Sequence, residues 1–131
     1  MSSEKNTLVP SKINYRKTAN LLELYYSDGT LLELEAELLR VYSPSADVRG
    51  HGEGNEVLQT GKKRVTLLDI KPAGSYAIKL CFDDGHDTGL YAWEYLYELG
   101  IHKEAFWKDY LRRIEEAGAS REPSLISIKQ L

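Results

Sequence analysis

Two Asp-Gly dipeptides, Asp28-Gly29 and Asp84-Gly85, constrain the fold of this chain more than any other feature. Each stands between two runs of strand-forming residues, where Asp-Gly favours a tight β-hairpin with a type I′ turn. A segment of helix formers follows each hairpin, at 35–41 and at 92–99. This shared order suggests an internal repeat, although two independent hairpins with the same turn chemistry would look similar.

The remaining pattern predicts an α+β fold: a mainly antiparallel sheet from two β-hairpins, each followed by a helix, with an extra C-terminal helix. Glycines after the second and third helices, Gly100 and Gly118, are typical of helix C-termini. Four glycines and no hydrophobic period predict a long loop over 43–63. Strands are predicted at 13–16, 21–26, 31–34, 65–72, 76–82 and 88–91, and helices at 35–41, 92–99 and 104–117. The predicted organisation is a flexible N-terminal tail at 1–10, one domain at 11–118 and a polar C-terminal tail at 119–131.

Composition excludes several functional classes. The 131 residues include 17 basic and 20 acidic side chains with no basic stripe, which does not favour nucleic-acid binding. No apolar run approaches the roughly 18 residues that a membrane span needs, and the polar start of the chain does not resemble a secretion signal. Cys81 is the single cysteine, so no internal disulfide forms, and we expect a cytoplasmic protein. Its place in a predicted strand favours burial as a small apolar side chain.

His86 is the histidine with the most suggestive surroundings. It follows Asp84-Gly85 in an acidic turn, and His51 lies in the glycine-rich loop. If turn and loop converge, His51, His86 and Asp84 could offer two imidazoles and a carboxylate to a divalent metal. The spacing matches no compact ligand motif, and acidic residues are also ordinary turn formers, so a solvated turn is the alternative. Arg49, beside the loop glycines, could hold an anion.

Several segments together resemble a known family. They are the hairpin at 27–30, LRVYSPSA at 39–46, VRGHG at 48–52, GSYAI at 74–78 and FDDGHDTGLY at 82–91. In combination they are similar to DUF971, the domain found at the N-terminus of gamma-butyrobetaine hydroxylase and as a stand-alone bacterial protein. The resemblance covers about residues 8 to 100.

The resemblance also carries an expectation about metal. In the hydroxylase the domain resembles a zinc module with three cysteines and one histidine. The cysteine positions correspond here to Ser43, Ser45 and Val48, and the histidine to His86. Because hydroxyls are poor zinc ligands beside thiolates, we expect no cofactor, with zinc or iron at His86 as the alternative. The hydroxylase's catalytic iron lies in a separate domain, so oxygenase activity is not expected and the chain is not predicted to be an enzyme.

The leading hypothesis is a non-catalytic binding or adaptor domain with a protein partner. Related domains are attached to Mrp-type ATPases that carry iron–sulfur clusters, which implies an accessory role in iron–sulfur or metalloenzyme systems. A single cysteine cannot hold a cluster within one chain. The alternatives are a metal-binding protein using the His86 turn and the 43–54 loop, and a structural subunit whose contact is the aromatic helix pair. The predicted binding surface comprises Ser43, Ser45, Arg49, His51, Asp84, His86 and Tyr91.

Overall fold

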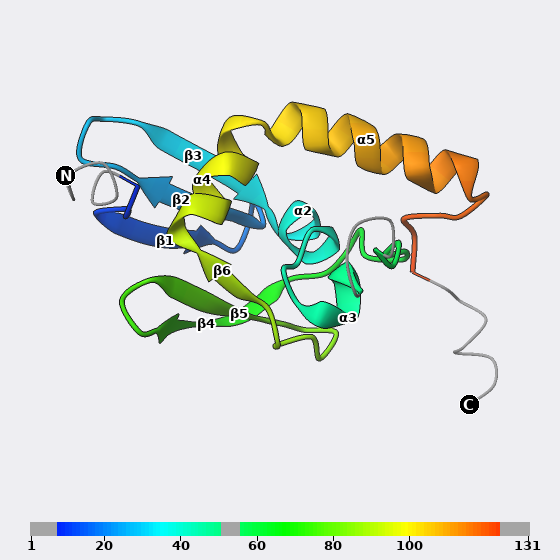
Figure 1. Ribbon diagram of the computed structural model, residues 1–131, viewed down its shortest axis with the longest axis horizontal. Helices are drawn as coiled ribbons and strands as arrows, with labels where there is room; N and C mark the ends of the chain where they lie inside the picture. Colours follow the sequence, from blue (N-terminus) through cyan, green and yellow to red (C-terminus); the bar gives the residue numbers. More distant parts are fainter. Residues whose placement is uncertain (1–7, 51–55, 124–131) are drawn as a thin grey trace.

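The computed structural model describes residues 8–50 and 56–123. Its strands form two separate antiparallel sheets, each with three strands in chain order (Figure 1). The first sheet contains β1 (Lys12–Arg16), β2 (Leu21–Tyr25) and β3 (Leu31–Glu35). The second contains β4 (Leu67–Ala73), β5 (Ala77–Phe82) and β6 (Leu90–Ala92). The helices are α2 (Ala36–Val41), α3 (Ala46–Arg49), α4 (Trp93–Ile101) and α5 (Lys103–Glu116). The α+β prediction is confirmed.

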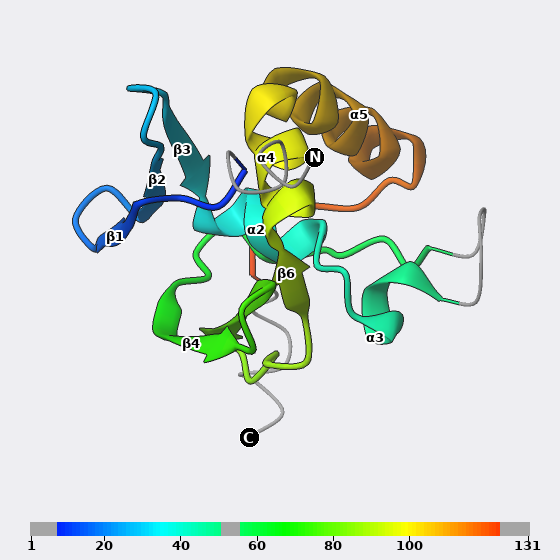
Figure 2. The same cartoon turned by 60° about the vertical axis from the view of Figure 1, so that its left-hand side comes forward.

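The two halves of the described chain repeat one local plan. In each, a three-stranded meander leads into a helix without a connecting loop: β3 ends at Glu35 just before α2, and β6 ends at Ala92 just before α4. Glu35 and Ala92 both have extended backbone angles, with ψ of 147° and 152°. Figure 2 shows β6 running straight into α4, with the first sheet and β4 on one side and α3 on the other. This arrangement fits the internal repeat suggested by the sequence.

Both Asp-Gly hairpins form, but their turns are longer than the predicted type I′ turn. In the first, the Tyr26 amide donates to the Thr30 carbonyl at 2.9 Å; in the second, Phe82 donates to His86 at 3.0 Å. Only the glycines adopt positive φ, 92° at Gly29 and 90° at Gly85. The loop therefore has three residues, a type I turn followed by a left-handed glycine. The type I′ prediction was wrong because the aspartates keep negative φ.

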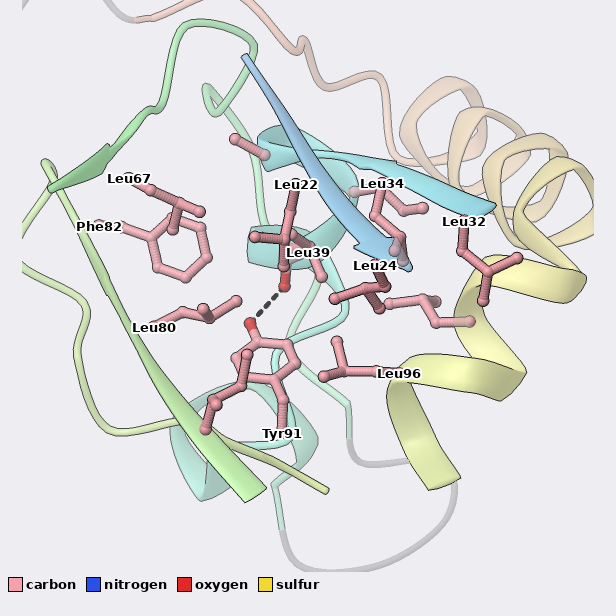
Figure 3. Packing of buried hydrophobic residues seen from close by; sticks show 14 of the residues in the cluster. Leu22, Leu24, Leu32, Leu34, Leu39, Leu67, Leu80, Phe82, Tyr91 and Leu96 are labelled. Atoms are coloured by element: carbon pink, nitrogen blue, oxygen red, sulfur yellow. Dashed lines mark hydrogen bonds between the residues drawn. The ribbon is translucent and has the colours of Figure 1, made fainter. Parts of the chain in front are cut away.

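One hydrophobic core joins the two sheets. The buried faces of β2 and β3 meet the buried face of β5, with α2 and α4 closing the sides (Figure 3). Tyr91 of β6 lies at the centre and is fully buried, and its hydroxyl donates to the Leu39 carbonyl of α2 at 2.5 Å. The labelled leucines of this core are Leu22, Leu24, Leu32, Leu34, Leu39, Leu67, Leu80 and Leu96. Since both halves contribute to it, neither meander would bury its apolar face alone.

Gly100 does not end the second predicted helix. α4 continues to Ile101, and Gly100 lies buried inside it against β3. A Cβ at this position would lie 2.8 Å from Leu32 Cδ1. The glycine therefore allows close packing of helix on strand, whereas Gly118, with φ of 63°, does follow the end of α5 as predicted.

Residues 119–123 contact the body of the protein. Arg121 forms a bidentate ion pair with Glu37 of α2, with both N–O distances 2.8 Å. Glu37 is only 5% exposed, and the Arg121 guanidinium also lies 4.9 Å from the centre of the Trp107 ring. This part of the predicted tail is therefore attached to α2 and α5.

Among the described helices, none is long and apolar enough to cross a membrane.

Candidate functional site: a junction between the Ser43–Arg49 segment and the second hairpin

The segment after α2 contains a short helix where the sequence predicted only loop. Ser45 begins α3, and its hydroxyl accepts a hydrogen bond from the Asp47 amide at 3.1 Å. This side chain stabilises the free amides of the first turn, as N-cap serines do. Val48 is buried on the inner side of α3, while Asp47 and Arg49 are exposed. The segment therefore has a defined inner and outer face.

Ser43 connects this segment to the second hairpin. Its hydroxyl lies 2.8 Å from Nε2 of His86, and it also accepts the Ser45 amide at 3.2 Å. Ser43 is only 1% exposed. Gly89 makes the approach possible, because a Cβ there would lie 2.5 Å from the Ser43 hydroxyl oxygen. Ser43, which the sequence analysis assigned to the binding surface, is therefore buried and makes an internal contact.

A second contact joins the same two segments nearer the surface. The hydroxyls of Ser45 and Thr88 lie 2.7 Å apart, and the Thr88 hydroxyl donates to Asp47 at 3.4 Å. Ser45 is 6% exposed, whereas Asp47 and Thr88 are exposed. Thr88 was not among the predicted site residues, although its place two residues after His86 could have indicated it. We call Ser43, Ser45, Asp47, His86 and Thr88 the serine–hairpin junction.

Asp84 fixes the hairpin turn to the rest of the protein. Its carboxylate accepts hydrogen bonds from Lys62 at 2.7 Å, from Arg40 at 2.8 Å and from the His86 amide at 3.1 Å. Partial burial alone would raise the pKa of Asp84, but these donors outweigh it and lower the pKa to about 2. The Asp84 carboxylate therefore carries its negative charge at neutral pH. The sequence did not indicate Arg40 or Lys62, because no local pattern links them to residue 84.

His86 is held as a neutral imidazole near pH 7. Partial burial, together with the positive charge of Arg40, lowers the pKa of His86 below its ordinary value of 6.5. The neutral ring can donate or accept at Nε2, so either tautomer satisfies the contact with Ser43. The ring also lies against Phe82, with centroids 6.2 Å apart. His86 therefore joins the hairpin to α2's C-terminal segment without carrying charge.

The other predicted surface residues divide between exterior and core. Arg49 is exposed, and its guanidinium lies over the Tyr95 ring at 5.0 Å. Tyr91 is fully buried and belongs to the core, so its assignment to the binding surface was wrong. The alternation of β6 turns its side chain inward. His51 lies outside the described residues. Cys81 is half-buried rather than buried, because it faces away from Leu80 and Phe82.

The junction does not have the ligands of a zinc site. Ser43 and Ser45 use their hydroxyls in internal hydrogen bonds, Val48 has no donor atom, and His86 is the single nitrogen ligand. Hydroxyls that stay protonated do not replace thiolates on zinc. Across residues 8–50 and 56–123, no group of three or more His, Cys, Asp or Glu side chains could hold a metal ion. The four positions that the family resemblance assigns to zinc are here linked by hydrogen bonds and packing.

These features define a small α+β domain of two meander–helix halves with a polar junction beside its core. The chain belongs to the gamma-butyrobetaine hydroxylase-like, N-terminal family, whose model matches residues 13–97, more than half of the sequence. Two similar solved structures, both determined by NMR in solution, share 52% and 49% identity. Each covers 88% of this chain, with TM-scores of 0.77 and 0.74, and the match spans 91% and 86% of the respective structure.

A crystal structure is also similar. It is a protein of unknown function from Acidithiobacillus ferrooxidans that belongs to the DUF971 family, with 34% identity and a TM-score of 0.61. The match covers 72% of this chain and 94% of that one. No curated protein matches. The comparisons confirm the DUF971 resemblance and place the chain in a family whose function is not defined.

Proposed function

We propose that this protein is a non-catalytic binding or adaptor domain that recognises a protein partner through the exposed side of the serine–hairpin junction. The observation that carries the proposal is the contact between Ser45 and Thr88 at 2.7 Å, which joins two segments far apart in sequence. It fixes the exposed side chains of Asp47 and Thr88 beside each other, with Arg49 on the same short helix. Preorganised polar side chains of this kind bind a partner with little ordering cost.

The buried part of the junction supports binding rather than catalysis. Ser43 and Ser45 are 1% and 6% exposed, and both hydroxyls already have partners inside the protein. A catalytic serine must present its oxygen to the substrate, with a base free to take its proton. Here the serine–histidine contact is structural, so recognition falls to the exposed residues around it.

The test is capture of a partner by the immobilised full chain from native extract of the source cells. We expect Arg49→Ala and Asp47→Ala to reduce the captured amount at least about tenfold, because charged contacts at an interface contribute on the order of 1–2 kcal/mol each. Arg64→Ala is the matched control, since Arg64 is an exposed arginine outside the junction. All three variants should retain the wild-type melting temperature.

The proposal fails if Arg49→Ala and Asp47→Ala capture the same proteins as the wild type, or if Arg64→Ala loses them equally. Identification of the captured protein by mass spectrometry tests the expected link to iron–sulfur or metalloenzyme systems. That link rests on the family resemblance alone. A captured partner without a metal or a cluster would contradict it while leaving the adaptor proposal intact.

Metal binding through the His86 turn has less support. Asp84 is fully engaged with Arg40 and Lys62, and His86 Nε2 is engaged with Ser43. A metal at Asp84 or at His86 Nε2 would compete with these contacts. Elemental analysis of the purified protein, with titration of zinc and iron(II) followed by His86 NMR signals, tests this alternative. A stoichiometric metal that shifts the His86 signals would favour it over the adaptor proposal.

A further inference from the structure

A pocket of about 430 Å³ opens next to the junction, between α3, α4 and α5. Much of its wall is apolar or aromatic, from Val41, Val57, Tyr42, Tyr95 and Phe106. Four charged residues complete it: Arg49, Glu56, Asp109 and Arg113. Its size lies at the low end of the range usual for small-molecule sites, about 300–1,000 Å³.

The aromatic wall is held in place by its own hydrogen bonds. The Tyr95 hydroxyl donates to the Tyr42 carbonyl at 2.5 Å, and the Tyr42 hydroxyl donates to the Phe106 carbonyl at 2.8 Å. The rings of Tyr42 and Phe106 pack edge to face with centroids 5.0 Å apart. Because these contacts link α2, α4 and α5, the pocket is preformed and needs little rearrangement to accept a ligand.

The charged residues of the pocket differ in how far they are already paired. Arg113 Nε lies 3.2 Å from the Asp109 carboxylate, and its Nη2 donates to the Tyr42 hydroxyl at 3.2 Å. Asp109 also pairs with Arg112 at 2.6 Å. Arg49 lies over Tyr95 at 5.0 Å and forms no ion pair with the residues that the structure describes. Arg49 is thus the cation most available to a ligand.

We propose that this pocket binds a monocarboxylate with an apolar body, with Arg49 holding the carboxylate and the aromatic wall holding the body. A guanidinium presents two parallel N–H groups that match one carboxylate. Glu56 and Asp109 line the same pocket and would repel a dianionic phosphate more strongly than a single carboxylate. A free organic acid and the C-terminal residue of a partner chain share this chemistry. The inference goes beyond the proposed function, because a free acid would bind without any partner protein.

The test is titration of the ¹⁵N-labelled full chain with phenylacetate, followed by NMR. Phenylacetamide is the neutral probe of the same shape, and phenyl phosphate is the dianionic one. Acetyl-Gly-Phe, with a free or an amidated C-terminus, represents the end of a partner chain. We expect saturable shifts at Val57, Tyr95 and Phe106 for the carboxylates, in the roughly millimolar range of small ligands.

Two variants distinguish binding in this pocket from nonspecific electrostatic attraction of the ligand. Arg49→Gln should weaken phenylacetate binding at least about tenfold, the effect of losing one charge-assisted contact. Arg64→Gln should leave it unchanged. Tighter binding of acetyl-Gly-Phe than of phenylacetate would assign the pocket to a chain terminus, and the reverse would assign it to a free acid.

Three results would overturn the inference. They are equal binding of phenylacetamide, tighter binding of phenyl phosphate, and absence of saturable shifts up to about 10 mM carboxylate. None of them bears on the adaptor proposal, which is decided by partner capture. Loss of capture in the Arg49 variant without any carboxylate binding would leave the adaptor proposal standing and reject the pocket.

Discussion

The hydroxyl of Ser43 lies 2.8 Å from Nε2 of His86, a contact between residues 43 positions apart in the sequence. It joins the end of α2 to the second hairpin, at two of the positions that family resemblance assigns to zinc. The first hairpin has the same turn but carries Thr30 where the second carries His86. The two turns therefore differ in what they connect rather than in how they fold.

His86→Thr gives the second hairpin the residue that the first one has. We expect the free energy of unfolding to fall by about 1–2 kcal/mol, because the buried Ser43 hydroxyl loses a hydrogen-bond partner. Thr30→Ala in the first hairpin is the control and should change it by less than about 0.5 kcal/mol. Urea denaturation measures both, and equal losses would show that the Ser43 contact contributes nothing specific.

The lowered pKa of His86 predicts a pH dependence of stability. The unfolded chain takes up the proton near the ordinary pKa of 6.5, whereas the folded chain does so at lower pH. The unfolded state therefore binds more protons below about pH 6.5, and the free energy of unfolding decreases as the pH falls through that window. Between about pH 7.5 and pH 5, the free energy of unfolding measured with urea should decrease less for His86→Thr than for the wild type. Identical decreases would contradict the prediction, as would an NMR titration of His86 with a midpoint above 6.5.

Gly89→Ala should destabilise the protein by about 2 kcal/mol or more, because the new Cβ would lie 2.5 Å from the Ser43 hydroxyl oxygen. A double-mutant cycle with Ser43→Ala identifies the cause. In the Ser43→Ala background, the loss from Gly89→Ala should shrink, since the contacting oxygen is gone. If urea denaturation shows that the two losses of free energy are additive, the destabilisation by Gly89→Ala comes from the backbone and not from the contact with Ser43.

Arg40 and Lys62 both pair with Asp84 but should contribute unequally. The Arg40 side chain is 8% exposed and the Lys62 side chain is 22% exposed. Arg40 also donates to Gln59 at 2.9 Å. Arg40→Met should lower the free energy of unfolding by about 2 kcal/mol, and Lys62→Met by less than about 1 kcal/mol. Thermal and urea denaturation of the two variants compare them directly, and a larger loss for Lys62→Met would reverse the interpretation.

Cysteines at the three positions that the family resemblance indicates should create a zinc site. In the variant Ser43→Cys, Ser45→Cys, Val48→Cys, three thiolates and His86 would supply a tetrahedral set. We expect one zinc per chain and a melting temperature that rises with zinc and falls with chelator. Cobalt substitution should give the absorption of thiolate ligation.

Adding His86→Thr to this variant is the control, and it should weaken zinc binding at least about tenfold. Unchanged binding would mean that the cysteines alone hold the metal. If the variant folds but binds no zinc, the four positions do not converge closely enough, and their correspondence to the family's ligands is contradicted.

Much of the fold was predictable from local patterns. The strands and helices begin and end within two or three residues of the predicted positions, because side-chain alternation and turn residues act over short stretches. The two exceptions have different causes, one a distant contact and the other a local cap. Gly100 lies inside α4 because Leu32 packs against it, and α3 forms within a glycine-rich stretch because Ser45 caps it.

The candidate site was predictable only in part. The resemblance indicated Ser43, Ser45 and His86, and the structure brings these three together. Arg40 and Thr88 lie in the resembling segments, but only the structure gives their roles, because Arg40 pairs with Asp84 and Thr88 with Ser45, more than 40 positions away in each case. Tyr91 was misplaced, since the sequence of a three-residue strand does not say which face meets the core.

The sequence by itself determined the two hairpins and the helices that follow them, because Asp-Gly turns and helix formers act on neighbouring residues. Tertiary structure alone decided that the halves form two sheets around one core, and that Ser43 meets His86. These outcomes depend on burial of apolar faces and on polar groups that need partners once buried. Both conditions are set by the whole chain rather than by any segment of it.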